Sequence, residues 1–255
     1  MEAHRHEVVE QFTAQAHGFA HAASIRDHSA LEQLITFAAA GPDDRVLDVA
    51  CGPGLVVCAF ARVARHATGV DITAAMIEQA REHAAEQGLA NVSWELGEIP
   101  PLRWPDASFE IVVSRYAFHH FEDPAAVLGE MARVCAPGGR VVVCDLALAP
   151  DKVEAFNAMD AIRDPSHVRA LSLAQLRQLF REAGLPAPRE ACYRLEGELE
   201  GLLARSFPAA GGADEVRARF RRSLADDHLG VDARLEPDGA ITYRYPIAVL
   251  AADVA

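Results

Sequence analysis

Apolar residues along the chain follow two spacings, one typical of buried strands and one typical of amphipathic helices. Strands are predicted where short apolar runs occur, at 45–50, 66–70, 91–96, 109–114, 140–146, 189–195 and 241–251. Helical spacing follows the first, second and fourth of these runs. Because strands that alternate with helices form parallel sheets, we expect an α/β fold with helices on both faces of the sheet.

The most informative segment is VLDVACGPG at 46–54, where an apolar strand runs into a glycine turn and then into the helical pattern of LVVCAFARVA. Gly52 and Gly54 allow the backbone to approach a ligand where a Cβ atom would collide. The helix that follows offers free N–H groups. Such a turn is typical of nucleotide-like ligands, dinucleotides included.

Asp48 distinguishes between the ligands that such a turn binds. A dinucleotide places a pyrophosphate at this turn, and a carboxylate beside it costs roughly a few kcal/mol of repulsion at intermediate dielectric. The third glycine of the dinucleotide pattern G-x-G-x-x-G is also missing, because Val57 stands in its place. A ligand with cationic groups, such as the sulfonium and ammonium of S-adenosylmethionine, is therefore favoured.

A second carboxylate follows the turn at the spacing that ribose binding requires. Asp71 ends the strand predicted at 66–70 and lies about 20 residues beyond the glycine turn. The neighbouring strand delivers a carboxylate to the ribose hydroxyls in both dinucleotide and S-adenosylmethionine folds. We therefore predict that Asp71 binds the ribose.

Composition narrows the choice of partner and location. The 255 residues include 37 acidic and 24 basic side chains, a formal net charge of −13, which disfavours nucleic acid as a partner. No apolar run reaches the roughly 18 to 20 residues that span a bilayer, and the N-terminus has no signal-peptide core. We expect a cytoplasmic protein without membrane insertion, monomeric or homodimeric. The five cysteines are widely spaced and indicate neither a disulfide framework nor a metal site.

Four motifs in order resemble those of the class I S-adenosylmethionine-dependent methyltransferases, in particular the small-molecule branch that includes the ubiquinone and menaquinone methyltransferases. The motifs are VLDVACGPG (46–54), GVDIT (69–73), the segment 97–124 and EMARVCAPGGRVVVCD (130–145). The resemblance implies a Rossmann-like, mostly parallel sheet of seven strands, whose last strand inserts antiparallel between strands five and six. It also implies methyl transfer from S-adenosylmethionine, without a metal, to a small-molecule acceptor of quinone or secondary-metabolite biosynthesis, with S-adenosylhomocysteine as the product.

The resemblance and the strand-end positions together predict the cofactor-binding residues. Glu98 stands where the family usually has an aspartate that accepts from the adenine amino group, and the next backbone N–H, of Ile99, donates to the ring. The predicted set is Asp48, Ala50, Gly52, Gly54, Asp71, Ile72, Glu98, Ile99 and Ser114.

The expected organisation is a single domain with additions on the substrate side. Residues 1–40 have helical spacing, either as a pair of packing helices or, as the resemblance implies, as a lid whose Phe12, Phe19 and His21 line the pocket. The remaining 41–255 form the methyltransferase domain. Within this domain, insertions beside the substrate are expected at 150–171 and at 196–236, the second of them helical.

Candidates for acceptor binding and catalysis cluster in two segments. The SRYAFHHF loop (114–121) follows strand four, and loops at the carboxyl ends of parallel strands carry ligand contacts. The RDPSH segment (163–167) resembles segments of the same methyltransferase branch. We predict His119 and His167 as candidate general bases, and Phe19, Arg115, Tyr116, His120 and Arg163 as acceptor-binding residues.

These residues are also compatible with two other functions. A nicotinamide-dependent oxidoreductase shares the glycine turn and Asp71, and a non-catalytic protein that binds S-adenosylmethionine shares the whole cofactor site. The sequence does not distinguish oxygen, nitrogen and carbon acceptors. It also leaves open whether a base is needed, because an acidic acceptor ionises unaided.

Overall fold

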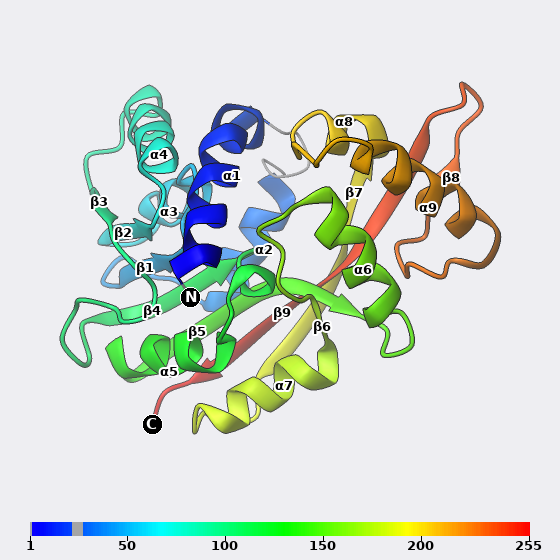
Figure 1. The fold of residues 1–255 in the computed structure, drawn as a ribbon. Coiled ribbons are helices and arrows are strands. Elements are labelled where there is room, and N and C mark those ends of the chain that lie inside the picture. Colours follow the sequence, from blue (N-terminus) through cyan, green and yellow to red (C-terminus); the bar gives the residue numbers. More distant parts are fainter. Residues whose placement is uncertain (1, 22–27) are drawn as a thin grey trace.

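A twisted sheet organises the computed structural model, which describes residues 2–21 and 28–255 (Figure 1). Its main path has the order β3-β2-β1-β4-β5-β9-β7. These strands are β1 (Arg45–Val49), β2 (His66–Asp71), β3 (Val92–Leu96), β4 (Phe109–Arg115), β5 (Cys135–Leu148), β7 (Arg189–Glu198) and β9 (Ile241–Asp253). Only β9 runs against the others along this path, between β5 and β7, so the Rossmann-like sheet with one inserted antiparallel strand is confirmed.

Helices cover both faces of the sheet because successive strand residues point to opposite sides. Val46 and Ile111 pack in one core, whereas their neighbours Leu47 and Val112 pack in the other. The first core lies under α2 (His28–Ala38), α3 (Leu55–Ala61), α4 (Ala74–Glu86), α6 (Val153–Arg163), α8 (Leu199–Leu203) and α9 (Gly212–Asp226). The second lies under α5 (Pro124–Val134) and α7 (Leu173–Glu182).

The sheet departs from the sequence prediction in three places. The two-residue strands β6 (Leu171–Ser172) and β8 (Arg234–Leu235) pair with β5 and β9, and their shortness explains why no apolar run marks them. Strand β5 begins at Cys135, before the predicted start at residue 140, because backbone pairing with β4 occurs at Cys135 and again from Arg140. The register with β4 shifts there, from Phe109 opposite Cys135 to Ile111 opposite Arg140.

Helix α1 (Glu2–His21) lies between α4 and α8 in Figure 1, over the strand ends at which β1 and β4 stop. Two buried glutamine side chains fix it there. Gln11 donates to the carbonyl oxygen of Ser206, and Gln15 donates to Oδ2 of Asp164 at 3.1 Å. Among the helices that the structure describes, none is long and apolar enough to cross a membrane.

Candidate active site

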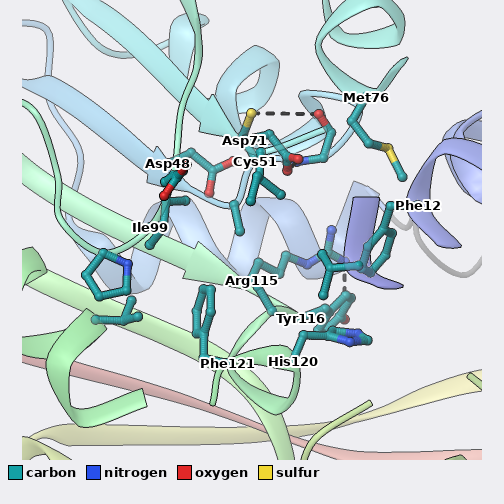
Figure 2. A pocket seen from close by; sticks show the side chains of 18 of the residues that line it. Phe12, Asp48, Cys51, Asp71, Met76, Ile99, Arg115, Tyr116, His120 and Phe121 are labelled. Atoms are coloured by element: carbon teal, nitrogen blue, oxygen red, sulfur yellow. Dashed lines mark hydrogen bonds between the residues drawn. The ribbon is translucent and has the colours of Figure 1, made fainter. Parts of the chain in front are cut away.

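A cavity of about 340 Å³ opens beside the carboxyl ends of β1, β2 and β4 (Figure 2). Ten of the predicted site residues line it: Asp48, Ala50, Gly52, Asp71, Ile72, Glu98, Ile99, Arg115, Tyr116 and His120. Helix α1 closes it from above with His4, Arg5, Val8 and Phe12. The cavity is therefore assembled from the strand ends and from the N-terminal helix together.

Asp48 is a buried carboxylate on the wall of this cavity. Its side chain is 1% exposed, and neither of its oxygens has a hydrogen-bond partner within the described part of the chain. Burial, with the nearby charge of Asp71, raises the pKa of Asp48 well above its ordinary value, although Arg115 opposes this rise. An isolated buried carboxylate is costly, so the site favours a ligand that brings a positive charge to it.

Asp71 ties the end of β2 to the glycine turn. Its Oδ2 accepts from the backbone N–H of Gly52 at 2.8 Å, and its Oδ1 accepts from that of Thr73 at 2.9 Å. Burial raises the pKa of Asp71 even though these two N–H groups lower it. Each oxygen keeps further lone-pair capacity, so the carboxylate can hold the turn and still accept from a ligand hydroxyl.

The two glycines of the turn have different roles. A Cβ atom on Gly52, whose φ is 49°, would meet nothing within 4 Å, so this residue leaves open space on the cavity side. A Cβ atom on Gly54 would lie 2.5 Å from Cη2 of Trp94, and Gly54 does not line the cavity. The structure thus places Gly54 where α3 packs against β3, and its predicted contact with the cofactor stays a prediction.

The missing third glycine also has a structural explanation. Val57 occupies that position, and its Cγ2 would lie 2.9 Å from a Cβ atom on Gly69 of β2. Gly69 therefore provides the space for α3 to approach the sheet, and a branched residue fits at 57.

Two residues at the cavity edge have left-handed backbones. Ala50 has a φ of 60° and Tyr116 has a φ of 59°. For residues with a Cβ atom this conformation costs roughly 1 to 2 kcal/mol. Both follow a strand end, where the chain turns from the sheet toward the cavity, so each of these two turns carries local strain at the cavity edge.

Glu98, the predicted adenine contact, forms an ion pair with Arg5 of α1. The two side chains are about half exposed, at 55% and 52%. Glu98 and Ile99 both line the cavity. The acid thus connects α1 to the loop that follows β3, in addition to any contact with a ligand.

The structure does not bring His119, His167 and Arg163 to the cavity wall. Nδ1 of His119 lies 2.7 Å from Oδ1 of buried Asp145. Burial alone would lower the pKa of His119, but Asp145 raises it. The raised pKa favours the protonated form of His119, which suits an ion pair and not a base.

The predicted residues of the RDPSH segment are held in a buried network behind the cavity. Nε2 of His167 lies 2.7 Å from Oδ1 of Asn157, and its Nδ1 lies 3.0 Å from Oδ2 of Asp160. Arg163 donates to both oxygens of Asp160, at 2.5 Å and 3.0 Å. The network connects α6 to the loop that follows it.

Ser114 is a further predicted residue that does not line the cavity. Ser114 is buried, and its hydroxyl donates to the carbonyl oxygen of Val49 at 2.8 Å, which joins β4 to β1. Phe19, with His21, belongs to α1, but these side chains lie outside the described residues.

Sequence reasoning missed several residues that line the cavity: His4, Arg5, Val8, Met76, Pro100 and Phe121. In the sequence, the apolar residues of this set could be recognised only as helix or loop residues. The polar residues, His4 and Arg5, lie before the first motif. Phe12, in contrast, was predicted to line the pocket because the family resemblance implies an N-terminal lid, and it does line the cavity. Within the described chain, no group of three or more histidine, cysteine or acidic side chains is arranged to hold a metal.

Known proteins resemble this fold and site. A methyltransferase domain family matches residues 40–184. The 27-O-demethylrifamycin SV methyltransferase of Amycolatopsis mediterranei is 32% identical over 204 residues, which cover 73% of this chain and 74% of that protein. The methyltransferase YcgJ of Bacillus subtilis is 38% identical over 149 residues, which cover 58% of this chain and 59% of that protein's length. The crystal structure of YcgJ matches with a TM-score of 0.81 at 28% identity, over 89% of this chain and 98% of the other.

The glycine turn, the two carboxylates at the strand ends and the sheet order define a methyltransferase of the Rossmann-like class. The chain belongs to the family of S-adenosylmethionine-dependent methyltransferases.

Proposed function

We propose that this protein transfers the methyl group of S-adenosylmethionine to a small-molecule acceptor that binds in the cavity beneath α1. The observation that carries the proposal is the buried Asp48 carboxylate, which has no hydrogen-bond partner among the residues described and lines the cavity. A ligand with a sulfonium and an ammonium supplies the missing positive charge. A pyrophosphate would instead add negative charge beside Asp48 and Asp71, which disfavours a nicotinamide dinucleotide.

The residues of the cavity suit this cofactor at each of its ends. Asp48 would attract the cationic end, and Asp71 would accept from the ribose hydroxyls. The open space at Gly52 lets a ligand approach the backbone closely. Glu98 and Ile99 would border the adenine. The bound cofactor supplies an electrophilic methyl group on a positively charged sulfur.

The protein's own contribution is to hold the acceptor and exclude water. Displacement at the methyl carbon requires the acceptor atom at about 3 to 3.5 Å, in line with the bond that breaks. Apolar side chains of α1, α4 and the loop after η1 (Phe118–His120) surround this end of the cavity, namely Val8, Phe12, Met76 and Phe121. With α1 in place as a lid, these side chains displace water from the reacting groups.

The class of acceptor is supported by the relatives. The name of the Amycolatopsis relative specifies a rifamycin that lacks an O-methyl group, which is a small secondary metabolite. We extend to this chain only the small-molecule class and a place in biosynthesis. A cytoplasmic location and a monomeric or homodimeric state stay predictions.

Calorimetry with S-adenosylmethionine, S-adenosylhomocysteine and NAD tests the cofactor. We expect both sulfur compounds to bind and NAD not to bind, and tight NAD binding alone would contradict the proposal. Turnover is tested by adding a small-molecule extract with tritium-labelled S-adenosylmethionine and measuring labelled products. Cofactor binding without turnover on any fraction would favour the non-catalytic alternative.

A further inference from the structure

Of the three histidines His119, His120 and His167, His120 is the one that lines the cavity. It lines the wall, and its ring packs edge-on against Phe12 of α1 with the ring centroids 5.0 Å apart (Figure 2). Within the described chain Nε2 of His120 has no hydrogen-bond partner, and it is not one of the buried polar atoms. Nε2 therefore keeps accessible surface, on a residue that lines the cavity.

Ser166 determines which ring nitrogen carries the hydrogen. Nδ1 of His120 lies 3.0 Å from the carbonyl oxygen and 3.2 Å from Oγ of Ser166. The carbonyl can only accept. The Ser166 hydroxyl donates its hydrogen to Oδ1 of Asp164 at 2.5 Å, so its Oγ also meets Nδ1 as an acceptor. Nδ1 must be the donor, which leaves the lone pair of the neutral ring on Nε2.

Asp164 holds Ser166 in this arrangement. Its Oδ1 also accepts from the backbone N–H of Ser166 at 3.0 Å, and its Oδ2 accepts from Gln15 of α1 at 3.1 Å. Burial raises the pKa of Asp164, but the Arg163 guanidinium, the His120 ring and the hydrogen bonds from Ser166 and Gln15 together hold that pKa below its ordinary value. Asp164 is thus a carboxylate that can only accept, as the orientation of the Ser166 hydroxyl requires.

The ring of His120 is neutral at physiological pH. Burial and, next, the charge of His119 lower the pKa of His120 to about 3. Around the ring lie His119 from η1, and Asp164 and His167 from the loop after α6. His4 of α1 contacts the carbonyl oxygen of His120, and Arg163 of α6 pairs with Asp164. These groups leave His120 as a hydrogen-bond acceptor toward the cavity.

We propose that His120 is the catalytic residue that takes the proton of the methyl acceptor, and that Ser166 and Asp164 are positioning residues that present its lone pair. The acceptor therefore belongs to the class in which an O–H or N–H group is methylated. This inference rests on the proposed methyl transfer.

The reaction balances with this assignment. The acceptor's O–H or N–H donates to Nε2, and the lone pair of the acceptor atom attacks the methyl carbon. The carbon–sulfur bond breaks with its electron pair left on sulfur, and the acceptor's proton passes to Nε2 of His120. Even a weakly basic ring suffices, because the acidity of the O–H or N–H rises steeply as the new bond to carbon forms. Protonated His120 then returns the proton to solvent.

The walls around His120 indicate a suitable probe. Phe12, Tyr116 and Phe121 also line the cavity, and these aromatic side chains favour a planar apolar ring. Phenol and anisole are matched in this respect, but only phenol can donate to Nε2. The experiment uses the full chain saturated with S-adenosylhomocysteine and labelled with ¹⁵N in its histidines. The His120 signal is assigned from its loss in His120→Phe.

We expect the hydrogen on Nδ1 of His120 at neutral pH, and a shift of the Nε2 signal with phenol but not with anisole. Phenol should bind about fivefold more tightly than anisole, the ratio that one ordinary hydrogen bond gives. His120→Phe should abolish this preference. Ser166→Ala should mix the two tautomers and reduce the preference, whereas Ser166→Thr, which keeps the hydroxyl, should retain both.

A hydrogen on Nε2, a ring protonated at neutral pH, no response to phenol, or a preference that survives in His120→Phe would each overturn the inference. Thermal unfolding shows whether the variants fold. If Ser166→Ala does not fold, the separate variants Ser166→Thr and His120→Phe still test the assignment. Failure of S-adenosylhomocysteine to bind the unmodified protein would count against the proposed function instead. Normal binding with no discrimination between the two probes would count against the role of His120 alone.

Discussion

Two walls of the cavity differ in how the chain builds them. The glycine-turn wall, formed by Asp48, Gly52 and Asp71, comes from two adjacent strand ends within one short stretch of sequence. The histidine wall, formed by Phe12 and His120, depends on α1, on η1 and on the RDPSH segment behind it. A compact motif therefore specifies the first wall, whereas the second exists only when distant segments pack together.

The walls also treat buried charge in opposite ways. Asp48 has no hydrogen-bond partner among the residues described, so the glycine-turn wall is prepared for a cation. Behind the histidine wall the acids are paired: Asp145 with His119, and Asp160 with Arg163. On the glycine-turn wall the ligand supplies the positive charge that compensates the buried Asp48, whereas behind the histidine wall basic side chains of the protein compensate the buried acids. Substitutions on the two walls should consequently affect different properties.

The largest effect is expected for His119→Ala, and on stability. Removing one partner of a buried ion pair leaves the other charge uncompensated, which costs about 3 to 5 kcal/mol. Urea denaturation should show this loss from the free energy of unfolding, whereas His120→Phe should change it far less. A stable His119→Ala protein that lost only turnover would return His119 to the role of a base.

The same pair gives this prediction a pH dependence. Asp145 raises the pKa of His119 above its ordinary 6.5, so this contribution is complete below pH 6.5 and is lost as the pH rises through the raised value. For Asp145, burial raises the pKa, but the interaction with His119 more than offsets this rise and the pKa is lowered. The stability that Asp145 contributes is therefore complete above pH 3.8 and is lost as the pH falls through the lowered value. The difference in the free energy of unfolding between wild type and His119→Ala should be largest between pH 3.8 and pH 6.5 and should decrease at higher pH.

On the glycine-turn wall, Asp71→Ala should have the larger effect on ligand affinity. Hydrogen bonds to a charged acceptor contribute about 1.5 to 3 kcal/mol, and Asp71 also holds the N–H of Gly52. We expect S-adenosylmethionine and S-adenosylhomocysteine to weaken to a similar degree, because they share the ribose. Calorimetry checks this, and a loss confined to S-adenosylmethionine would show that Asp71 responds to the sulfonium.

Asp48→Asn should weaken S-adenosylmethionine by about tenfold, or 1.4 kcal/mol, because the favourable charge is lost. The same change should stabilise the ligand-free protein near pH 7. Burial raises the pKa of Asp48, so the folded state loses stability as the pH rises above the ordinary value of 3.8. The stability advantage of the variant should therefore shrink as the pH is lowered toward 4. Unchanged affinity in calorimetry would remove Asp48 from the cofactor site.

The contrast between the walls explains what the sequence could predict. Hydrophobic spacing and local motifs predicted the strands and the positions of Asp48 and Asp71 at strand ends, and the family resemblance of those motifs implied the antiparallel β9. The capping box that begins α7 at Ser172 was likewise predictable, because four consecutive residues specify it.

The choice between adjacent histidines was not predictable. His119 and His120 share one loop and one residue type, yet Asp145 holds the first and Ser166 orients the second. Only the packing of η1 against β5 and the 164–170 loop separates their environments. The ion pair between Arg5 of α1 and Glu98 was also not predictable, because only the tertiary structure brings these two side chains together.

The smallest effect, on the dissociation rate of the ligand, is expected at the ion pair between Arg5 of α1 and Glu98 in the loop after β3. Both side chains are about half exposed, so the pair is screened by solvent and contributes at most about 1 kcal/mol. Arg5→Ala should therefore speed the dissociation of S-adenosylhomocysteine by no more than about fivefold, and 0.5 M salt should give wild type most of that increase, because salt screens exposed charges. The exchanged pair, Arg5→Glu with Glu98→Arg, should restore slow dissociation if the contact only holds α1 closed. If Glu98→Ala instead weakens affinity far more than Arg5→Ala, and the exchanged pair does not recover it, then Glu98 binds the ligand directly and α1 closes over the cavity without needing it.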